Sequence, residues 1–105
     1  MARVEKIKNL TGKKIMNVLG EHSEILRKYK VKKIGLFGSY ARREEESYSD
    51  IDFLIDFEEP NFDDFMNLAF YLEDLFGKKV ELITNGNLSP YIQPYVEKDI
   101  LWYEV

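Results

Sequence analysis

Residues 38–55 read GSYARREEESYSDIDFLI, and this stretch decides the fold. Apolar residues alternate through its second half, which predicts a strand over 50–57 with one apolar face. Upstream, Lys33–Phe37 is typical of a second short strand, and Gly38-Ser39 ends it. Residues 40–43 are expected to start a short helix. The stretch therefore predicts a strand, a tight turn, a short helix and a return strand.

Asp50 and Asp52 are the first candidate functional residues. Side chains two apart on a strand point to the same face, so their Cα atoms lie roughly 6.5–7 Å apart. Two such carboxylates repel one another unless a cation lies between them, and Mg²⁺ prefers a few carboxylates plus phosphate oxygens. Asp56 has the same parity but lies roughly 13 Å from Asp52, too far to share an ion. The alternative is an ordinary solvated strand face.

Gly38-Ser39 is the second candidate feature. A glycine that ends a strand lets backbone N–H groups approach an anion, and the Ser39 hydroxyl adds a donor. This is not a Walker loop, because the Gly-Lys-Ser/Thr signature is absent. By itself the pair also fits a plain turn. Together with an Asp-x-Asp ten residues further on, it indicates a site for a phosphate and a metal.

The remaining pattern predicts an α/β chain. Apolar residues at helical spacing favour a helix from Thr11 to about Tyr29, and Asn61 can cap a second helix that stops at Gly77. The order of elements describes one domain over residues 1–105, with helices packed on a sheet. The other expected elements are a strand over 79–84, a helix over 90–97 and a strand over 100–103.

Residues 38–42 and 49–55 together resemble the signature of the nucleotidyltransferase superfamily that includes DNA polymerase β, and most closely its minimal members, the MNT domains. Residues 80–83 lie where that family carries its third acidic residue, here Glu81. Residues 88–92 resemble the family's tail, so the likeness covers about residues 12–103. The family often has Gly at the position of Arg43 and commonly Asp at the position of Glu81.

This resemblance implies the polymerase β-like fold, a mixed sheet with helices packed against it. It also implies ATP as the substrate and Mg²⁺, two ions, as the cofactor. Arg42 is expected either to reach a phosphate or to pair with a glutamate of residues 44–46. The implied site consists of a catalytic and metal-binding triad, Asp50, Asp52 and Glu81, and nucleotide-binding residues, Gly38, Ser39 and Arg42.

Composition narrows the function further. The net charge of −4 argues against direct nucleic-acid binding, although residues 1–43 hold 12 of the 15 Lys and Arg and only 3 of the 19 Asp and Glu. That basic region could flank the acidic site or simply coat a solvated helix. The absence of cysteine, of a signal-like segment and of a long apolar run predicts a cytoplasmic protein without a membrane span.

The acceptor is expected on another protein, since 105 residues leave little room for a substrate-binding domain. The minimal family resembles the antitoxin half of toxin–antitoxin pairs whose toxin is a HEPN ribonuclease. This implies transfer of AMP to a tyrosine of that toxin and a complex with it. Two alternatives stay open: a non-catalytic nucleotide-binding module that masks a partner protein, and a subunit of a small-molecule transferase of the aminoglycoside type.

Overall fold

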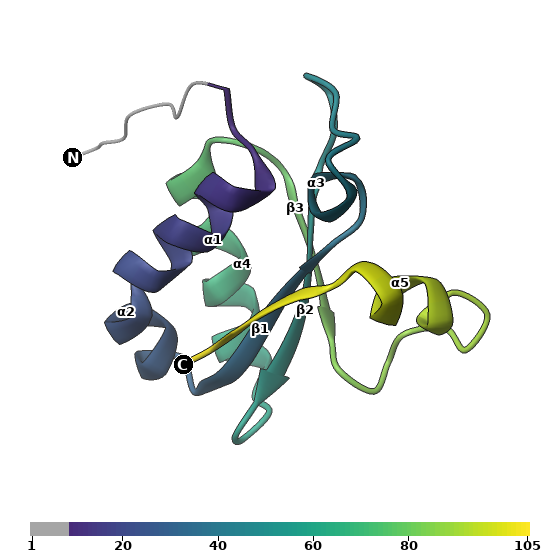
Figure 1. The fold of residues 1–105 in the computed structure, drawn as a ribbon. Helices are drawn as coiled ribbons and strands as arrows, with labels where there is room; N and C mark the ends of the chain where they lie inside the picture. Colours follow the sequence, from purple (N-terminus) through teal and green to yellow (C-terminus); the bar gives the residue numbers. More distant parts are fainter. Residues whose placement is uncertain (1–8) are drawn as a thin grey trace.

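The computed structural model describes residues 9–105, which form one mixed four-stranded sheet and five helices (Figure 1). The sheet order is β3-β2-β1-β4, with β2 and β3 parallel and the other pairs antiparallel. The predicted α/β class and mixed sheet are therefore confirmed. The elements in chain order are α1 (Gly12–Glu21), α2 (Ser23–Lys28), β1 (Val31–Phe37), α3 (Ser39–Arg42), β2 (Ile51–Phe57), α4 (Phe62–Phe76), β3 (Val80–Thr84), α5 (Gln93–Asp99) and β4 (Leu101–Glu104).

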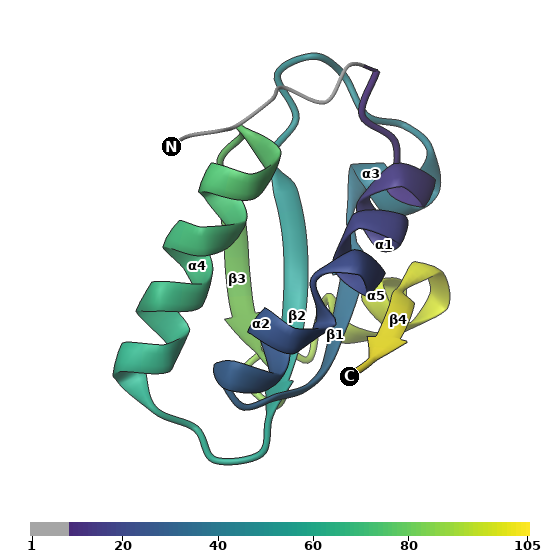
Figure 2. The same ribbon diagram turned by 90° about the vertical axis from the view of Figure 1, so that its left-hand side faces the viewer.

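The two faces of the sheet are covered differently. Helices α1, α2 and α4 lie together on one face, and α5 lies alone on the other (Figures 1 and 2). The larger core fills the first face and includes Phe53, Leu19, Leu68 and Leu72, none of which is exposed. A smaller cluster under α5 joins four buried residues, Phe37, Leu54, Leu88 and Val96.

The helix ends follow the local sequence. Thr11 accepts a hydrogen bond from the Lys14 N–H at 3.2 Å, and Asn61 accepts one from the Asp64 N–H at 3.0 Å. Each side chain satisfies one of the unpaired donors in the first turn of its helix. Gly77 ends α4 in the left-handed region, at φ 66°. The predicted caps at all three positions are confirmed.

The helix expected from Thr11 to Tyr29 is instead two helices that meet at His22. The His22 N–H bonds to the carbonyl of Leu19, three residues back, at 3.1 Å. Its Nδ1 meanwhile donates to the Val18 carbonyl at 2.9 Å, which in a continuous helix would accept from the backbone. The side chain thus takes the place of one helical hydrogen bond and separates α1 from α2.

The last helix begins later than expected, at Gln93 rather than Pro90. The Ser89 carbonyl accepts from the N–H groups of Ile92 and Gln93, which forms a turn before the helix. Pro94 then lies in the first turn, where its missing N–H costs nothing. Within residues 9–105, no helix is both long and apolar enough to cross a membrane.

Candidate active site

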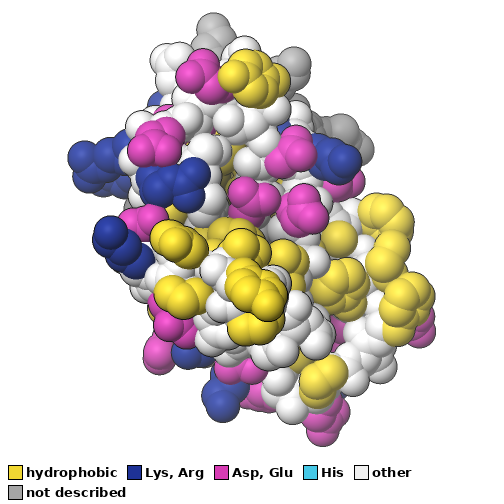
Figure 3. Space-filling model, turned by 90° about the vertical axis from the view of Figure 1, so that its right-hand side faces the viewer, with side chains coloured by type: hydrophobic (Ala, Val, Ile, Leu, Met, Phe, Trp, Pro, Cys, Tyr) yellow, Lys and Arg dark blue, Asp and Glu magenta, His cyan; other side chains and the backbone are white. Residues whose placement is uncertain are grey.

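The three predicted acidic residues come together at one end of the sheet. Asp52 lies on β2 directly opposite Glu81 on the parallel strand β3, and opposite Phe37 on β1. Paired residues on neighbouring strands are about 5 Å apart and point to the same face. Asp50 immediately precedes β2 and has the same parity as Asp52. Leu54 has the same parity as Asp52 and packs with Val96 of α5, so the Asp52 side chain lies on the α5 side of the sheet. On the face of the molecule in Figure 3, acidic groups border a broad group of hydrophobic ones.

Gly38 lies against the carboxylate of Asp52. It follows β1 at φ 80°, a conformation that L-residues with side chains rarely adopt. A Cβ at this position would collide with the Oδ2 atom of Asp52. The sequence analysis predicted that glycine is needed here so that a phosphate can approach the backbone. The structure adds a second reason, since only glycine leaves room for the Asp52 side chain.

The environment raises the pKa of Asp52 to about 6. Burial is the largest cause, followed by the negative charges of Glu81 and then Asp50, while Arg42 acts weakly in the opposite direction. Glu81 and Asp50 are themselves exposed. A half-buried carboxylate beside two others is costly to ionise and gains from a bound cation. Perturbed carboxylates of this kind cluster at functional sites.

The carboxylate oxygens at this end of the sheet are ligands of the kind that Mg²⁺ binds. Carboxylate oxygens are hard ligands, and Mg²⁺ usually takes one or two of them together with water and substrate phosphates. Asp50 and Asp52 can supply such a pair. Among the described residues, however, no three acidic or histidine side chains stand close enough to hold an ion by themselves. The three-carboxylate centre, with Glu81 as a ligand, therefore stays a prediction.

Comparison with known proteins assigns the family. Residues 19–103 match the family model of the nucleotidyltransferase domain. This chain belongs to the nucleotidyltransferases. A protein adenylyltransferase of Methanocaldococcus jannaschii is 43% identical over 97 residues, which span 88% of this chain and 97% of that protein. The protein adenylyltransferase MntA of Thermococcus cleftensis is 39% identical over 95 residues, covering 89% and 96%.

Solved structures share the fold of this nucleotidyltransferase. A minimal nucleotidyltransferase superposes with a TM-score of 0.75 at 24% identity, covering 90% of this chain and 98% of that one. The MNT antitoxin in complex with a tri-AMPylated Shewanella oneidensis HEPN toxin gives a TM-score of 0.61 at 20% identity, covering 86% and 73%. The expected minimal nucleotidyltransferase fold is confirmed.

Arg42 forms one of the two contacts expected for it, the pair with a nearby glutamate. Its Nε donates to Oε1 of Glu44 at 3.0 Å, the surface pairing that the sequence allowed. Its charge also acts on Asp52, and its side chain borders a cavity beside Gly38. An exposed ion pair of this kind contributes little stability, so the guanidinium can exchange Glu44 for a phosphate at small cost. Its phosphate role stays a prediction.

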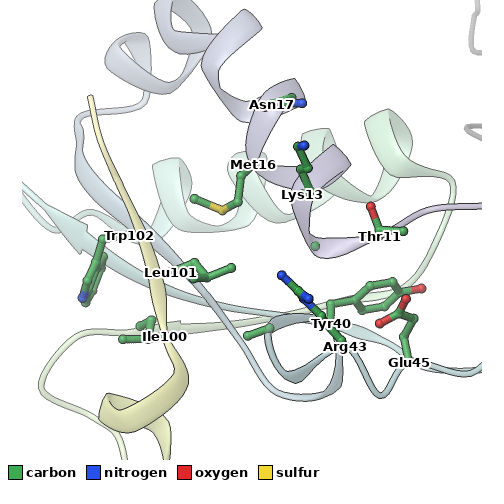
Figure 4. Close-up of a pocket in the computed structure, with 12 residues that line it drawn as sticks. Thr11, Lys13, Met16, Asn17, Tyr40, Arg43, Glu45, Ile100, Leu101 and Trp102 are labelled. Carbon is green, nitrogen blue, oxygen red and sulfur yellow. The ribbon is translucent and has the colours of Figure 1, made fainter.

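A further cavity of the nucleotidyltransferase lies behind α3, and neither Asp50, Asp52 nor Glu81 lines it. It has a volume of about 750 Å³ and lies between α1, α3 and β4 (Figure 4). Its walls include Met16, Leu101 and Trp102, with Lys13 and Arg43 as cations, but none of the predicted site residues. No pair of carboxylates lines this cavity. The acidic end of the sheet therefore remains the candidate active site.

Residues of α5 and of the turn before it lie near the site but were missed by the sequence reasoning, which predicted a short helix and a likeness to the family's tail and gave them no role in binding. Ile92 and Tyr95 line the cavity beside Gly38, and Tyr91, Ile92 and Tyr95 are 87%, 46% and 72% exposed. Exposed large apolar side chains clustered next to a catalytic site are unusual enough to indicate binding. The available signal was Tyr95, a large aromatic residue next to the apolar positions 92, 96 and 100.

Proposed function

We propose that this nucleotidyltransferase is a Mg²⁺-dependent protein adenylyltransferase that transfers AMP from ATP to a tyrosine hydroxyl of a HEPN toxin and thereby acts as its antitoxin. The observation that carries the proposal is the position of Asp52, held between Gly38 and Glu81 with its pKa raised to about 6. A carboxyl group in that position releases its proton to water readily when a cation arrives with a triphosphate and takes its place.

The chain's own residues divide the reaction between them. Gly38 and Ser39 would receive the triphosphate, and Asp50 and Asp52 would hold Mg²⁺, which would supply positive charge next to the α-phosphate. The acceptor oxygen attacks the α-phosphorus, the bond to the β-phosphate oxygen breaks, and pyrophosphate leaves. The hydroxyl proton passes to a carboxylate. Glu81 suits that step because it is exposed and lies next to Asp52.

The relatives support a protein acceptor. Two of them, at 43% and 39% identity, are named protein adenylyltransferases, and this chain matches nearly their whole length. The carboxylates of Asp50 and Glu81 are exposed, so a folded partner can reach them from solvent. Docking of two folded surfaces provides the orientation that a substrate-binding domain provides in a larger enzyme.

The HEPN toxin is proposed from the structural neighbour in which an MNT antitoxin lies in complex with an AMPylated toxin of that class. AMP would place a bulky anion on a ribonuclease. Near a site that binds RNA phosphates, this charge repels the substrate. The two open alternatives, a masking module and a small-molecule transferase, differ from this proposal in their products.

The test is co-expression with the cognate HEPN protein, followed by intact mass spectrometry of that protein and an assay of its ribonuclease activity. With the unaltered chain we expect additions of the mass of AMP and loss of ribonuclease activity. Asp52→Asn should give no addition. Asp56→Asn is the matched control on the same strand, and it should transfer normally because it lies too far along β2 to share an ion.

Neutralisation of the toxin by Asp52→Asn without added mass would replace the proposal with the masking module. Transfer to a free aminoglycoside but not to the protein would favour the small-molecule transferase. An unmodified and active toxin beside the unaltered chain would refute the antitoxin role.

A further inference from the structure

The cavity of about 750 Å³ behind α3 has no part in the transfer described above. Its walls come from α1, α3 and β4 (Figure 4). Its volume falls within the range of about 300–1,000 Å³ that is usual for small-molecule sites. Neither Gly38 nor Ser39 lines it, and none of the three predicted carboxylates does. A ligand in this cavity would therefore leave the proposed nucleotide site free.

One part of the wall is apolar. Met16 of α1 is partly buried, and Leu101 of β4 is 40% exposed although it borders the cavity. Leu101 points from β4 towards α3 (Figure 4). An apolar ligand body laid against these two side chains would cover surface that is otherwise open to water.

Two cations line the same cavity from different elements. Lys13 lies in the first turn of α1, and Arg43 directly follows α3. Within residues 9–105, neither of them forms a salt bridge. Like charges that face one space attract an anion into it, and the amino-terminal end of α1 adds to this attraction.

Both cations occupy positions that are unfavourable for the fold. Lys13 lies at the positive end of the α1 dipole, where a carboxylate would be more stable. Arg43 has a φ of 62°, in the left-handed region that favours glycine. Residues persist in unfavourable positions where their side chains have a use that offsets the cost. Binding of an anion between α1 and α3 is a use that fits both residues.

Glu45 is the carboxylate in the wall, and it lies towards the other end of the cavity. Burial is the largest cause of the raised pKa of Tyr40, and the charge of Glu45 is the next. The Glu45 carboxylate therefore lies near the Tyr40 ring, and in Figure 4 the two side chains lie together, away from Leu101. The anionic group of a ligand thus belongs at the two cations, and its apolar body belongs towards β4.

We propose that this cavity is a second binding site of the enzyme, for a small organic anion with an apolar body. Lys13 and Arg43 hold the anionic group, and Met16 and Leu101 hold the body. The inference does not rest on the proposed function, since it requires neither a nucleotide nor a protein acceptor.

The experiment compares two fluorescent probes that share one aromatic framework. Anilinonaphthalene sulfonate carries an anionic group, and phenylnaphthylamine lacks it. In fluorescence titrations we expect one sulfonate probe to bind per chain, at least about fivefold more tightly than the neutral probe. Lys13→Ala should weaken binding of the sulfonate by roughly fivefold and of the neutral probe by less than about twofold, since only a charge is lost.

Three further variants sharpen the result. Leu101→Ala shortens the apolar wall, so it should weaken both probes by about threefold. Lys28→Ala is the matched control for charge, because it removes an exposed cation of α2 that does not line the cavity. Tyr91→Ala is the control for exposed apolar surface, since Tyr91 is 87% exposed outside the cavity. Neither control should change either affinity, and a thermal melt verifies that each variant is folded.

An equal loss of sulfonate binding in Lys13→Ala and Lys28→Ala would trace the affinity to overall charge and overturn the site. A loss in Tyr91→Ala would place the probe on the exposed surface before α5, with the same consequence. Displacement of the probe by a non-hydrolysable ATP analogue with Mg²⁺ would place it in the nucleotide site and also overturn the inference. Each of these results leaves the proposed function to the co-expression test, which uses no probe.

Discussion

The two faces of β2 carry different kinds of residue, although both faces belong to one strand of seven residues. One face presents Ile51, Phe53 and Ile55, fully buried, to α1, α2 and α4. The opposite face presents Asp52 and Leu54 towards the side covered only by α5. The first face holds the domain together, and the second carries charges that a stable fold would not need. The difference shows where stability has been given up for chemistry.

Phe53→Ala tests the apolar face and should have the largest effect on stability. Phe53 is fully buried, and its ring centroid lies 6.2 Å from that of Phe76 on α4. Removing such a side chain costs roughly 3–5 kcal/mol of unfolding free energy, a large part of the total for a domain of this size. Urea unfolding followed by circular dichroism measures it.

Leu54→Ala, one residue along, is the comparison for Phe53→Ala. Leu54 is 4% exposed in the smaller cluster under α5, so we expect a loss of about 2 kcal/mol, at the low end for Leu→Ala. A loss for Leu54→Ala that equals or exceeds the loss for Phe53→Ala would show that the two faces contribute alike, and the comparison would fail.

The pH dependence of stability tests the charged face. The folded-state pKa of Asp52, about 6, lies above its ordinary value of 3.8, so the folded chain binds this proton more tightly than the unfolded chain does. The contribution to unfolding free energy is therefore fully present below about pH 4 and is lost as the pH rises through about 6. The full shift corresponds to about 3 kcal/mol, and solvent screening of this half-exposed side chain reduces the expected loss to about 2 kcal/mol. Thermal melts in chelator across this range measure it.

Asp52→Asn isolates that contribution, because the variant and the unaltered chain differ only in this carboxyl group. At pH 7.5 the unfolding free energy of the variant should exceed that of the unaltered chain by about 2 kcal/mol, the loss given above. This difference in unfolding free energy should disappear towards about pH 4. Mg²⁺ with an ATP analogue should stabilise the unaltered chain and not the variant. A gap that stays constant with pH would contradict the raised pKa.

Local patterns in the sequence were sufficient to predict much of the fold. The caps at Thr11 and Asn61, the stop at Gly77 and the strand with Asp52 depend on contacts within a few residues, so each was predicted correctly. Glu81 was assigned to the same site as Asp52 only through the family resemblance, and their direct pairing was not predicted, because strand register depends on distant parts of the chain.

The remaining features depend on tertiary packing. Leu54 lies between Asp52 and Asp56 on the polar face of the strand, but α5 and the segment before it bury Leu54, which no pattern within β2 predicts. The break at His22 depends on a side-chain hydrogen bond that competes with the backbone. The cavity beside Gly38 joins residues more than fifty positions apart, so neither segment indicates it alone.

Substitutions of Arg43 should change the unfolding free energy least. Arg43 lies in the connection between β1 and β2, just after α3. It ends α3 in the left-handed region, at φ 62° and ψ 36°, which is unfavourable for a residue with a Cβ. The strain has a structural use, since this turn leads from the segment proposed to bind phosphate into the loop before Asp50. Glycine removes the strain but makes the unfolded chain more flexible. Arg43→Gly should therefore raise the unfolding free energy by only about 0.5 kcal/mol, or the melting temperature by roughly 2–4 °C.

Arg43→Ala removes the same side chain and keeps the strain, so it should give no increase. Because Arg43 lines the cavity behind α3 rather than the acidic end, transfer should stay within about twofold in both variants. Equal stabilisation by alanine and glycine would trace the effect to the arginine side chain and its neighbours instead of the backbone.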